Sequence, residues 1–280
     1  MGKERVAILG GRGMLGTDLV NECGRQGINF EIFDLPEFDI TNESHLSRAI
    51  KNAGAVINCA AYTNVEKAES ESELAYKVNA DAVGKLGFFA AAAGVRVLHI
   101  STDFVFDGKS DRPYVETDAP NPINIYGKSK LAGERLLVES GCANCIMRVE
   151  WTYGRSGNNF VSKLIESAKK GQKLRVIDDQ VGSPTATAEA AKAILNLLAK
   201  RPTGLYHFAA GGYVNRFEMA KFIFEKLKMS VDLSSCKSSD YKTAAQRPLN
   251  SCFDCSKIQK LLGEPIKPWQ EPLENFLRQI

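Results

Sequence analysis

A tyrosine and a lysine with helical spacing are the residues of this sequence best suited to catalysis. Tyr126 and Lys130 lie four positions apart, which places both side chains on one face of a helix. A phenol has a pKa of about 10, so it is a poor acid–base catalyst at neutral pH unless a nearby cation lowers that pKa. We therefore expect Lys130 to lower the pKa of Tyr126 and to hydrogen-bond the ribose of a cofactor.

A threonine at the end of a predicted strand strengthens this interpretation. The Y-x-x-x-K spacing is common, and a surface Tyr and Lys is its ordinary explanation. Thr102, however, follows the apolar run Val95–Ile100, and ligands of open α/β sheets bind at the carboxyl ends of the strands. A hydroxyl there can orient a substrate carbonyl toward Tyr126. We predict a catalytic set of Thr102, Tyr126 and Lys130.

A glycine-rich loop joins the first predicted strand to the first helix. Gly10, Gly13 and Gly16 form a G-x-x-G-x-x-G pattern. Such a turn brings the backbone close to a pyrophosphate, which the helix N-terminus then binds. The spacing departs from the G-x-G-x-x-G fingerprint, and a packed strand–helix turn is the alternative.

Two residues predict opposite cofactor preferences. Asp34 ends the second predicted strand, 18 residues after Gly16. An acid near this position binds the adenosine ribose and repels a 2′-phosphate, which favours NADH. Arg12, inside the glycine loop, would attract that phosphate and favour NADPH. The sequence leaves the choice between NADH and NADPH open.

Short apolar runs alternate with helical stretches through the first half of the chain. The predicted strands, interpreted as buried on both faces of a sheet, are Val6–Leu9, Phe30–Phe33, Ala55–Asn58, Val95–Ile100 and Cys145–Val149. The predicted helices are Met14–Gly24, Ser44–Asn52, Ala75–Ala93 and a segment from Tyr126 to Glu139. This alternation predicts an α/β fold with a doubly wound parallel sheet.

The pattern loosens after Trp151, which indicates a smaller lobe. Predicted helices are Asn158–Lys170, Ala186–Lys200, Arg216–Leu227 and Trp269–Leu277, with short strands at Leu174–Ile177 and Leu205–Phe208 and a polar loop at Ser234–Arg247. We assign 1–150 to a dinucleotide-binding domain that carries Tyr126 and Lys130, and 151–280 mainly to a substrate-binding lobe. The boundary is soft, because such lobes exchange segments with the core.

Composition argues against several partners. The 280 residues carry a formal net charge of +3, which gives no electrostatic case for nucleic acid or an anionic membrane. The longest stretches without a charged residue, 52–65 and 202–215, have 14 residues each, whereas a membrane-spanning helix needs about 20. No signal-peptide pattern opens the chain. We expect a globular protein of the cytoplasm.

Cysteine and histidine usage does not indicate a metal site. The seven cysteines include two C-x-x-C pairs, Cys142/Cys145 and Cys252/Cys255. A zinc ribbon places such pairs about 15–20 residues apart, whereas these lie much farther apart. We predict buried thiols, and structural roles for His45, His99 and His207.

Longer strings resemble the dTDP-4-dehydrorhamnose reductase family of the extended short-chain dehydrogenase/reductases. The strings are NCAAYTNVEKAE at 58–69, STDFVFDG at 101–108, PYVETDAP at 113–120, YGKSKLAGE at 126–134, RVEWTYG at 148–154, GNNF at 157–160, DQVGSPT at 179–185 and RPLNS at 247–251. The similarity spans essentially the whole chain. It implies a Rossmann-type fold with a smaller C-terminal lobe.

The resemblance assigns roles to individual residues. It makes Tyr126 the proton donor, Lys130 its partner and Thr102 the carbonyl-orienting group. The implied cofactor residues are Gly10, Gly13, Met14, Leu15 and Gly16 at the pyrophosphate, Asp34 at the ribose, Asp39 and Ile40 at the adenine, and Ala61, Tyr62 and Thr63 at the nicotinamide half. The implied substrate residues are Thr102, Asp103, Trp151, Gln180 and Arg247. Asn79 matches a helix asparagine that assists the proton relay, and a core position is the alternative for Trp151.

The implied activity is reduction of a nucleotide-sugar ketone. It is the reduction of dTDP-4-dehydro-6-deoxy-L-mannose at C4 to dTDP-L-rhamnose by NADH or NADPH. Some family members bind magnesium at a contact within a homodimer, but no magnesium ligands can be placed here. Glu150 stands where the family usually has a small residue, which leaves open a reductase or epimerase of another nucleotide sugar. A cofactor-binding regulatory subunit is a further alternative, against which the complete set of Thr102, Tyr126 and Lys130 argues.

Overall fold

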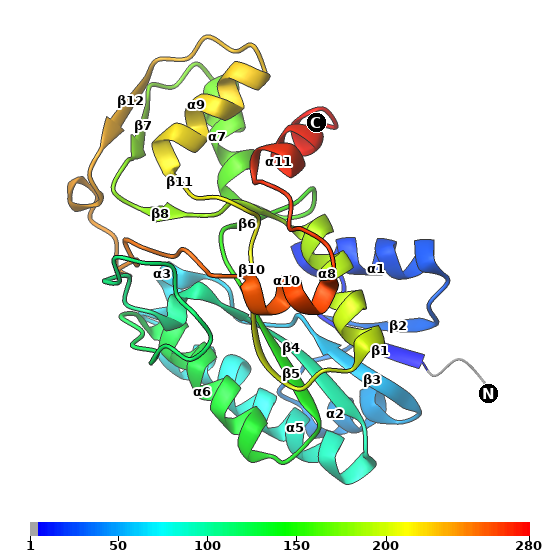
Figure 1. The fold of residues 1–280 in the computed structure, drawn as a ribbon. Coiled ribbons are helices and arrows are strands. Elements are labelled where there is room, and N and C mark those ends of the chain that lie inside the picture. Colours follow the sequence, from blue (N-terminus) through cyan, green and yellow to red (C-terminus); the bar gives the residue numbers. More distant parts are fainter. Residues whose placement is uncertain (1–4) are drawn as a thin grey trace.

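A parallel sheet of six strands forms the centre of the computed structural model, which describes residues 5–280 (Figure 1). The strands are β1 (Arg5–Leu9), β2 (Phe30–Phe33), β3 (Ala53–Asn58), β4 (Arg96–Thr102), β5 (Asn144–Val149) and β10 (Gly204–Phe208). Their order across the sheet is β10-β5-β4-β3-β1-β2. Because the chain moves outward from β1 to β2 and then returns to β3 on the other side, a crevice opens above β1 and β3.

Helices cover both faces of this sheet. One face packs on α1 (Met14–Gln26), α8 (Thr187–Lys200) and α10 (Ser256–Leu262), with Leu19 and Ile194 in a shared core. The other packs on α2 (Glu43–Ile50), α5 (Ala82–Ala93) and α6 (Ile125–Glu139), with Leu46, Leu86 and Leu137 fully buried. The predicted doubly wound α/β fold is confirmed.

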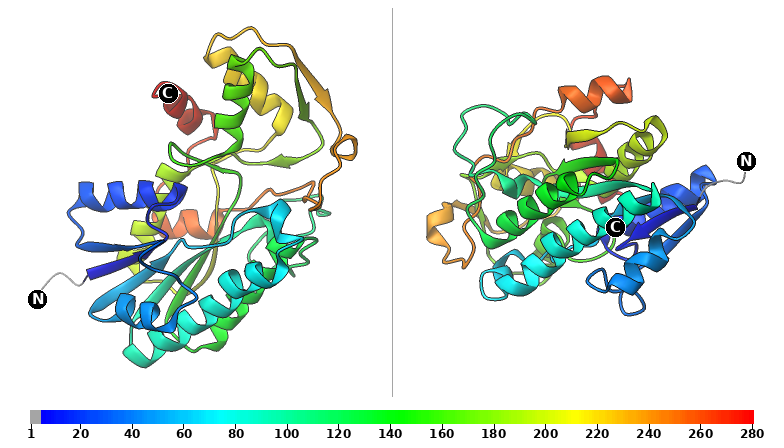
Figure 2. Two further views of the ribbon diagram at one scale, coloured as in Figure 1. Left: turned by 180° about the vertical axis from the view of Figure 1, so that it is seen from behind. Right: turned by 90° about the horizontal axis from the view of Figure 1, so that it is seen from below.

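The smaller lobe lies over the carboxyl ends of the sheet strands (Figure 2). Its core joins α7 (Phe160–Lys169), α9 (Arg216–Lys226) and α11 (Gln270–Leu277) around Ile223 and Leu273. Three short strand pairs frame it: β7 (Leu174–Ile177) with β12 (Leu233–Cys236), β8 (Val181–Gly182) with β11 (Val214–Asn215), and β6 (Thr152–Tyr153) with β9 (Thr185–Ala186). The lobe therefore closes the crevice from above.

Several sequence predictions need correction. The strand Phe30–Phe33 is not buried on both faces, because β2 is the edge strand and both Glu31 and Ile32 are exposed. The segment Ser234–Arg247 is not simply a loop, since it contains most of β12 and the short 3-10 helix η3 (Ser238–Asp240). Neither β12 nor α10 was predicted, because their apolar runs are too short to show a period.

The predicted helix over 75–93 contains a change of geometry. Short helices α3 (Val65–Ala68) and α4 (Ser72–Tyr76) lead into a π-helical turn, η1 (Lys77–Asp81), before α5 begins. Such turns occur frequently at functional sites. This one carries Asn79, whose amide nitrogen donates to the Tyr62 carbonyl at 3.0 Å and to Ser129 Oγ of α6 at 3.0 Å. Asn79 thus ties the loop after β3 to the helix that carries Tyr126.

Candidate active site

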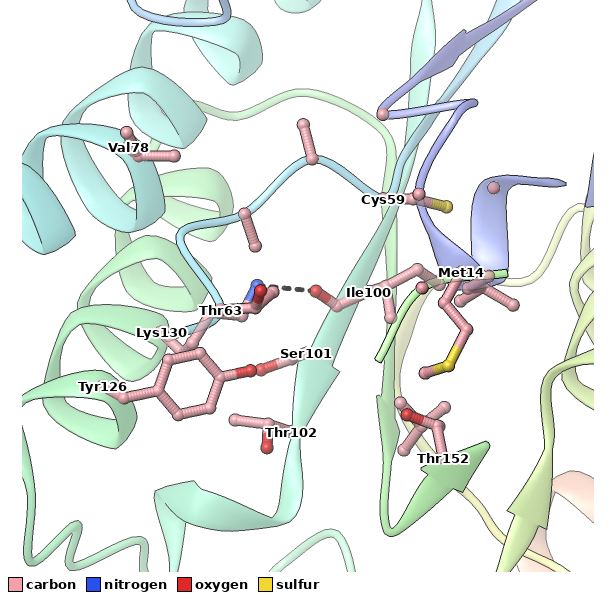
Figure 3. A pocket seen from close by; sticks show the side chains of 18 of the residues that line it. Met14, Cys59, Thr63, Val78, Ile100, Ser101, Thr102, Tyr126, Lys130 and Thr152 are labelled. Carbon is pink, nitrogen blue, oxygen red and sulfur yellow. Dashed lines mark hydrogen bonds between the residues drawn. The ribbon is translucent and has the colours of Figure 1, made fainter. Parts of the chain in front are cut away.

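A cavity of about 640 Å³ lies between the carboxyl ends of the sheet and the lobe (Figure 3). It brings together most of the predicted site residues. They are Gly10, Gly13, Met14, Leu15, Gly16, Asp34, Asp39, Ile40, Ala61, Thr63, Thr102, Asp103, Tyr126, Lys130 and Trp151. Tyr62 differs, since its phenol turns to Glu71 Oε2 at 2.6 Å. The glycine loop and the proposed catalytic set therefore share one space.

The glycine loop is packed so tightly that side chains have no room. A Cβ on Gly16 would lie 2.1 Å from the Gly10 carbonyl oxygen, and a Cβ on Gly10 would lie 2.7 Å from the Ala60 nitrogen. Gly10 also has a φ of +74°, a region that favours glycine. These contacts hold the N-terminus of α1 directly at the end of β1. The packing explains why the loop needs these glycines even before a ligand is considered.

The N-terminus of α1 is suited to an anion. Its N-cap residue, Gly13, provides no side-chain acceptor, and the first turn contains no acidic residue. In contrast, α2, α6, α7 and α9 each begin with an asparagine whose side chain accepts from the backbone. Free N–H groups and the helix dipole make such an end a binding site for phosphate. The residues present therefore fit the pyrophosphate of a dinucleotide.

Asp34 lines the cavity at the end of β2, and Arg12 of the glycine loop lies beside it. The Arg12 backbone N–H donates to Asp34 Oδ2 at 2.7 Å, and the Leu35 N–H donates to Asp34 Oδ1 at 2.8 Å. The Arg12 guanidinium donates to the Leu35 carbonyl and to Glu37 Oε2, each at 2.8 Å. Asp34, which predicts NADH, and Arg12, which predicts NADPH, are therefore in direct contact, so their positions alone do not decide the preference.

Tyr126 projects from the first turn of α6 into the cavity beside Thr102 (Figure 3). Its ring packs edge-to-face on Phe104 at 5.5 Å between centroids. Burial raises the pKa of Tyr126 to about 12, although a hydrogen bond with Thr102 acts in the opposite direction. The proximity of Lys130 predicts a lower pKa, but burial dominates. The phenol is therefore fully protonated at neutral pH.

Lys130 is buried, with only 2% of its surface exposed. Its ammonium donates to the Ile100 carbonyl at 2.7 Å, drawn as a dashed line in Figure 3, and lies 3.2 Å from His99 Nε2. Burial lowers the pKa of Lys130 to about 8. His99 in turn contacts the Asn58 amide at 3.1 Å, and burial and Lys130 hold the pKa of His99 well below its usual value. His99 therefore has the predicted structural role and positions Lys130.

Two carboxyl groups are buried at the lobe side of the cavity. Asp103 accepts from Ser251 Oγ at 2.5 Å and from Thr102 Oγ1 at 3.0 Å. Glu150 accepts from the Ser183 and Phe253 backbone N–H groups at 3.0 and 3.3 Å. Burial raises the pKa of both carboxyl groups, and for Glu150 the nearby Asp103 raises it further.

Arg216, the first residue of α9, lines the cavity but belongs to none of the sequence motifs. Its guanidinium carbon lies 3.4 Å from the Trp151 ring centroid and 4.8 Å from that of Phe160. Burial lowers the pKa of Arg216 to about 9. One signal in the sequence points to it. A cation at a helix N-terminus interacts unfavourably with the helix dipole, so an arginine at the start of the predicted helix Arg216–Leu227 indicates a role other than helix stability.

A second cavity of about 1140 Å³ continues from the first into the lobe. It contains Gln180 and Arg247, which do not reach the first cavity. Asn158, Asn159 and Arg216 line both cavities. Arg247 pairs with Glu66 at 2.5 Å and is about one-third exposed. The predicted substrate residues therefore fall into two groups that a long ligand would have to bridge.

No group of three or more His, Cys, Asp or Glu residues that could hold a metal ion occurs within residues 5–280. All seven cysteines are free thiols, and Cys142, Cys145 and Cys252 are buried as predicted, whereas Cys255 is only partly buried. His207 is buried, and it stacks on Phe253 with ring centroids 4.1 Å apart. None of the helices in the described part of the chain is long and apolar enough to cross a membrane.

A Rossmann-type sheet, an uncapped glycine-loop helix and a Thr–Tyr–Lys set at one cavity define a nicotinamide-dinucleotide-dependent oxidoreductase. Residues 4–280 match the family model described as RmlD substrate binding domain. The chain is 37% identical to dTDP-4-dehydrorhamnose reductase of Aggregatibacter actinomycetemcomitans, over 97% of this chain and 98% of that one. It is 33% identical to the Escherichia coli enzyme of the same name, over 98% and 97%. The chain belongs to the dTDP-4-dehydrorhamnose reductase family, as its sequence motifs predict.

Solved structures agree with this assignment. The Bacillus anthracis dTDP-4-dehydrorhamnose reductase, solved in complex with NADP, superposes with a TM-score of 0.95 at 37% identity, covering 99% of this chain and 100% of that one. The dTDP-glucose 4,6-dehydratase DesIV of Streptomyces venezuelae has a TM-score of 0.86 at 19% identity, covering 98% of this chain and 96% of that one. The second comparison shows the shared fold alone.

Proposed function

We propose that this chain reduces the C4 ketone of dTDP-4-dehydro-6-deoxy-L-mannose, giving dTDP-L-rhamnose. The observation that carries this proposal is the shared cavity, in which Thr102, Tyr126 and Lys130 face the glycine loop. Family membership supplies the substrate class, and the geometry supplies the chemistry. The bound nicotinamide cofactor would provide the hydride that C4 accepts.

Negative charge develops on O4 as the ketone is reduced, and three side chains respond to it. Thr102 hydrogen-bonds the oxygen and orients it toward the phenol. Tyr126 donates the proton, because the phenol is protonated at neutral pH and the alkoxide that forms at O4 is the stronger base. Lys130 then stabilises the phenolate electrostatically, because its ammonium is held in the same buried region. His99 keeps that ammonium in place.

The cofactor would lie along the first cavity. Its pyrophosphate would meet the N-terminus of α1 at Gly10, Gly13, Met14, Leu15 and Gly16. The adenosine half would meet Asp34, Asp39 and Ile40, and the nicotinamide half would meet Ala61, Thr63 and the pair Tyr126 and Lys130, whereas Tyr62 does not line this cavity. These residues fit a dinucleotide because the helix end is uncapped and the glycines at 10, 13 and 16 add no side chain to the loop.

We further propose NADPH as the preferred cofactor. The Arg12 guanidinium lies at the adenosine end, and its pair with Glu37 is exposed, at 59% and 64% of the two side chains. Exposed pairs contribute at most about 1 kcal/mol, so a 2′-phosphate can displace Glu37 easily. The NADP bound by the Bacillus anthracis relative supports this choice.

The substrate would extend from one cavity into the other. Its sugar would lie at Thr102, Asp103 and Trp151, and its nucleotide end at Gln180 and Arg247. Under this proposal 1–150 bind the dinucleotide and 151–280 mainly bind the substrate, although β10 and α8 of the second segment complete the first.

The test is to mix the purified protein with this nucleotide sugar and compare NADPH with NADH by following absorbance of the reduced cofactor. We expect faster oxidation of NADPH, and a loss of about 100- to 10,000-fold in kcat for Tyr126→Phe. Turnover of a different nucleotide sugar alone would redirect the assignment to a related reductase or epimerase. No turnover together with a stoichiometric enzyme partner in a pull-down would favour the regulatory alternative.

We place the reaction in the cytoplasm, where reduced nicotinamide cofactors are available and free thiols such as the seven found here are typical. The homodimer remains a prediction, which light scattering of the purified protein can test. A magnesium ion at its contact remains unplaced.

A further inference from the structure

Arg216 is a partly buried cation whose hydrogen-bonding capacity is unused. Within residues 5–280, its guanidinium donates no hydrogen bond, although stacking contacts hold it in place. Other shielded arginines of this chain are paired, Arg148 with Glu134 and Arg247 with Glu66. The nitrogens of Arg216 are not fully enclosed by protein, so its N–H groups are open to the two cavities that the side chain lines.

The residues around Arg216 fix the orientation of its planar guanidinium group. Its guanidinium stacks on one face of Trp151. Gly182 lies against that indole, since a Cβ there would be 2.6 Å from Trp151 Cε2 and 2.8 Å from Glu150 Oε2. Trp151 itself has a φ of +44°, a costly conformation for a non-glycine residue. A strained backbone and a required glycine thus position one aromatic platform for one cation.

The nearby carboxylates attract Arg216 but have their own hydrogen-bond partners. Asp103 is held by Ser251 and Thr102. Glu150 is held by two backbone N–H groups. Both carboxyl groups favour the charged form of Arg216, whereas Arg247 opposes it. The cation is thereby retained at this position with its N–H groups free for another acceptor.

We propose that Arg216 binds the diphosphate of the substrate where the ligand passes from the catalytic cavity into the second cavity. Arg216 lines both cavities, and so do Asn158 and Asn159. A ketosugar at Thr102 and Tyr126 and a nucleoside beside Gln180 would place the linking diphosphate at this junction. The inference rests on the proposed function for the direction of the ligand. Guanidinium groups bind phosphate oxygens in pairs, which a stacked, planar donor favours.

Calorimetry with dTDP and with thymidine tests this role on the full chain saturated with NADPH. We expect Arg216→Gln to weaken dTDP binding by about 10- to 100-fold, because a charge-assisted hydrogen bond is lost. Thymidine, which has no phosphate, should bind all variants equally. Arg216→Lys keeps the charge but not the paired donors, so its affinity should fall between those of the other two proteins.

Lys221→Gln is the matched control, since it removes one positive charge from the same helix at an exposed position paired with Glu218. It should bind dTDP like the wild type, and every variant should bind NADPH normally, which verifies folding. Equal dTDP affinity in the wild type and in both Arg216 variants would overturn the inference. If Arg216→Gln does not bind NADPH, it has not folded correctly, and the dTDP affinity of Arg216→Lys then tests the inference.

Turnover separates this inference from the proposed function. If the wild type does not reduce the dTDP-ketosugar but loses dTDP affinity on Arg216→Gln, the proposed reaction fails and Arg216 remains a diphosphate ligand. If reduction occurs and the KM of Arg216→Gln for the sugar nucleotide is unchanged, the reaction stands and the role of Arg216 fails. Absence of dTDP binding to the wild type would overturn both.

Discussion

A buried ion pair holds helix α6 against the sheet. Arg148 of β5 donates from Nε and Nη2 to the two carboxylate oxygens of Glu134 of α6, at 2.8 and 2.6 Å. The side chains are only 3% and 7% exposed. Arg148 also lies 5.1 Å from the Phe106 ring centroid. Because Tyr126 and Lys130 lie on the same helix, this pair helps to set their distance from β4.

Replacing Glu134 with Gln would leave the Arg148 cation buried without a counter-charge. Breaking a buried pair from one side costs about 3–5 kcal/mol, and the ring of Phe106 does not offset this loss because it contacts Arg148 in the wild type as well. We therefore expect Glu134→Gln to lower the free energy of unfolding by about 3–5 kcal/mol. This is a large fraction of the about 5–15 kcal/mol typical of folded proteins.

Urea unfolding followed by circular dichroism measures the change. Glu166→Gln is the matched control, since its partner Lys170 is also a single cation but both side chains are at least 60% exposed. That variant should lose no more than about 0.5 kcal/mol. The double variant Glu134→Gln/Arg148→Met should recover most of the loss, because no unpaired charge remains. A loss below about 1 kcal/mol in Glu134→Gln would refute the reasoning.

Two further predictions concern the glycine loop and the buried Lys130. Gly16→Ala should weaken NADPH binding at least about tenfold in a fluorescence titration, because its Cβ would overlap the Gly10 carbonyl and force the loop to move. Gly24→Ala, in the same helix with no atom within 4 Å of its Cβ, should bind NADPH normally. Burial lowers the pKa of Lys130 to about 8, so between pH 8 and about 10.5 the unfolded chain binds more protons than the folded one and stability rises with pH. Across this range the wild type should gain up to about 3 kcal/mol of unfolding free energy relative to Lys130→Met, whereas a constant difference would contradict the assigned cause.

Local patterns carried the prediction of the Rossmann core. The strands that became β1, β3, β4 and β5 are apolar runs buried on both faces, so their composition alone indicates their environment. The β2 strand has a similar composition but lies at the sheet edge, and strand order is not visible in composition. The short strand β12 forms only because β7 lies beside it.

That Thr102, Tyr126 and Lys130 line one cavity was predictable for a similar reason. Thr102 ends a strand, and Tyr126 and Lys130 lie one turn apart on a helix. The distance between the two helical residues in the fold therefore follows directly from their spacing in the sequence. The direction of the Tyr126 pKa shift was not predictable, since it depends on how much solvent the surrounding residues exclude. Desolvation is a property of packing, and it outweighed the expected effect of the lysine.

The sequence by itself determined the family, the doubly wound sheet and the proposed proton donor, because each can be recognised from residue types and their spacing along the chain. Only the tertiary structure decided that Arg216, Trp151 and Gly182 form one layered site and that Arg216 lines two adjoining cavities. These residues come from separate segments of the lobe. Their chemistry arises from stacking and exclusion of water between segments, which no local spacing records.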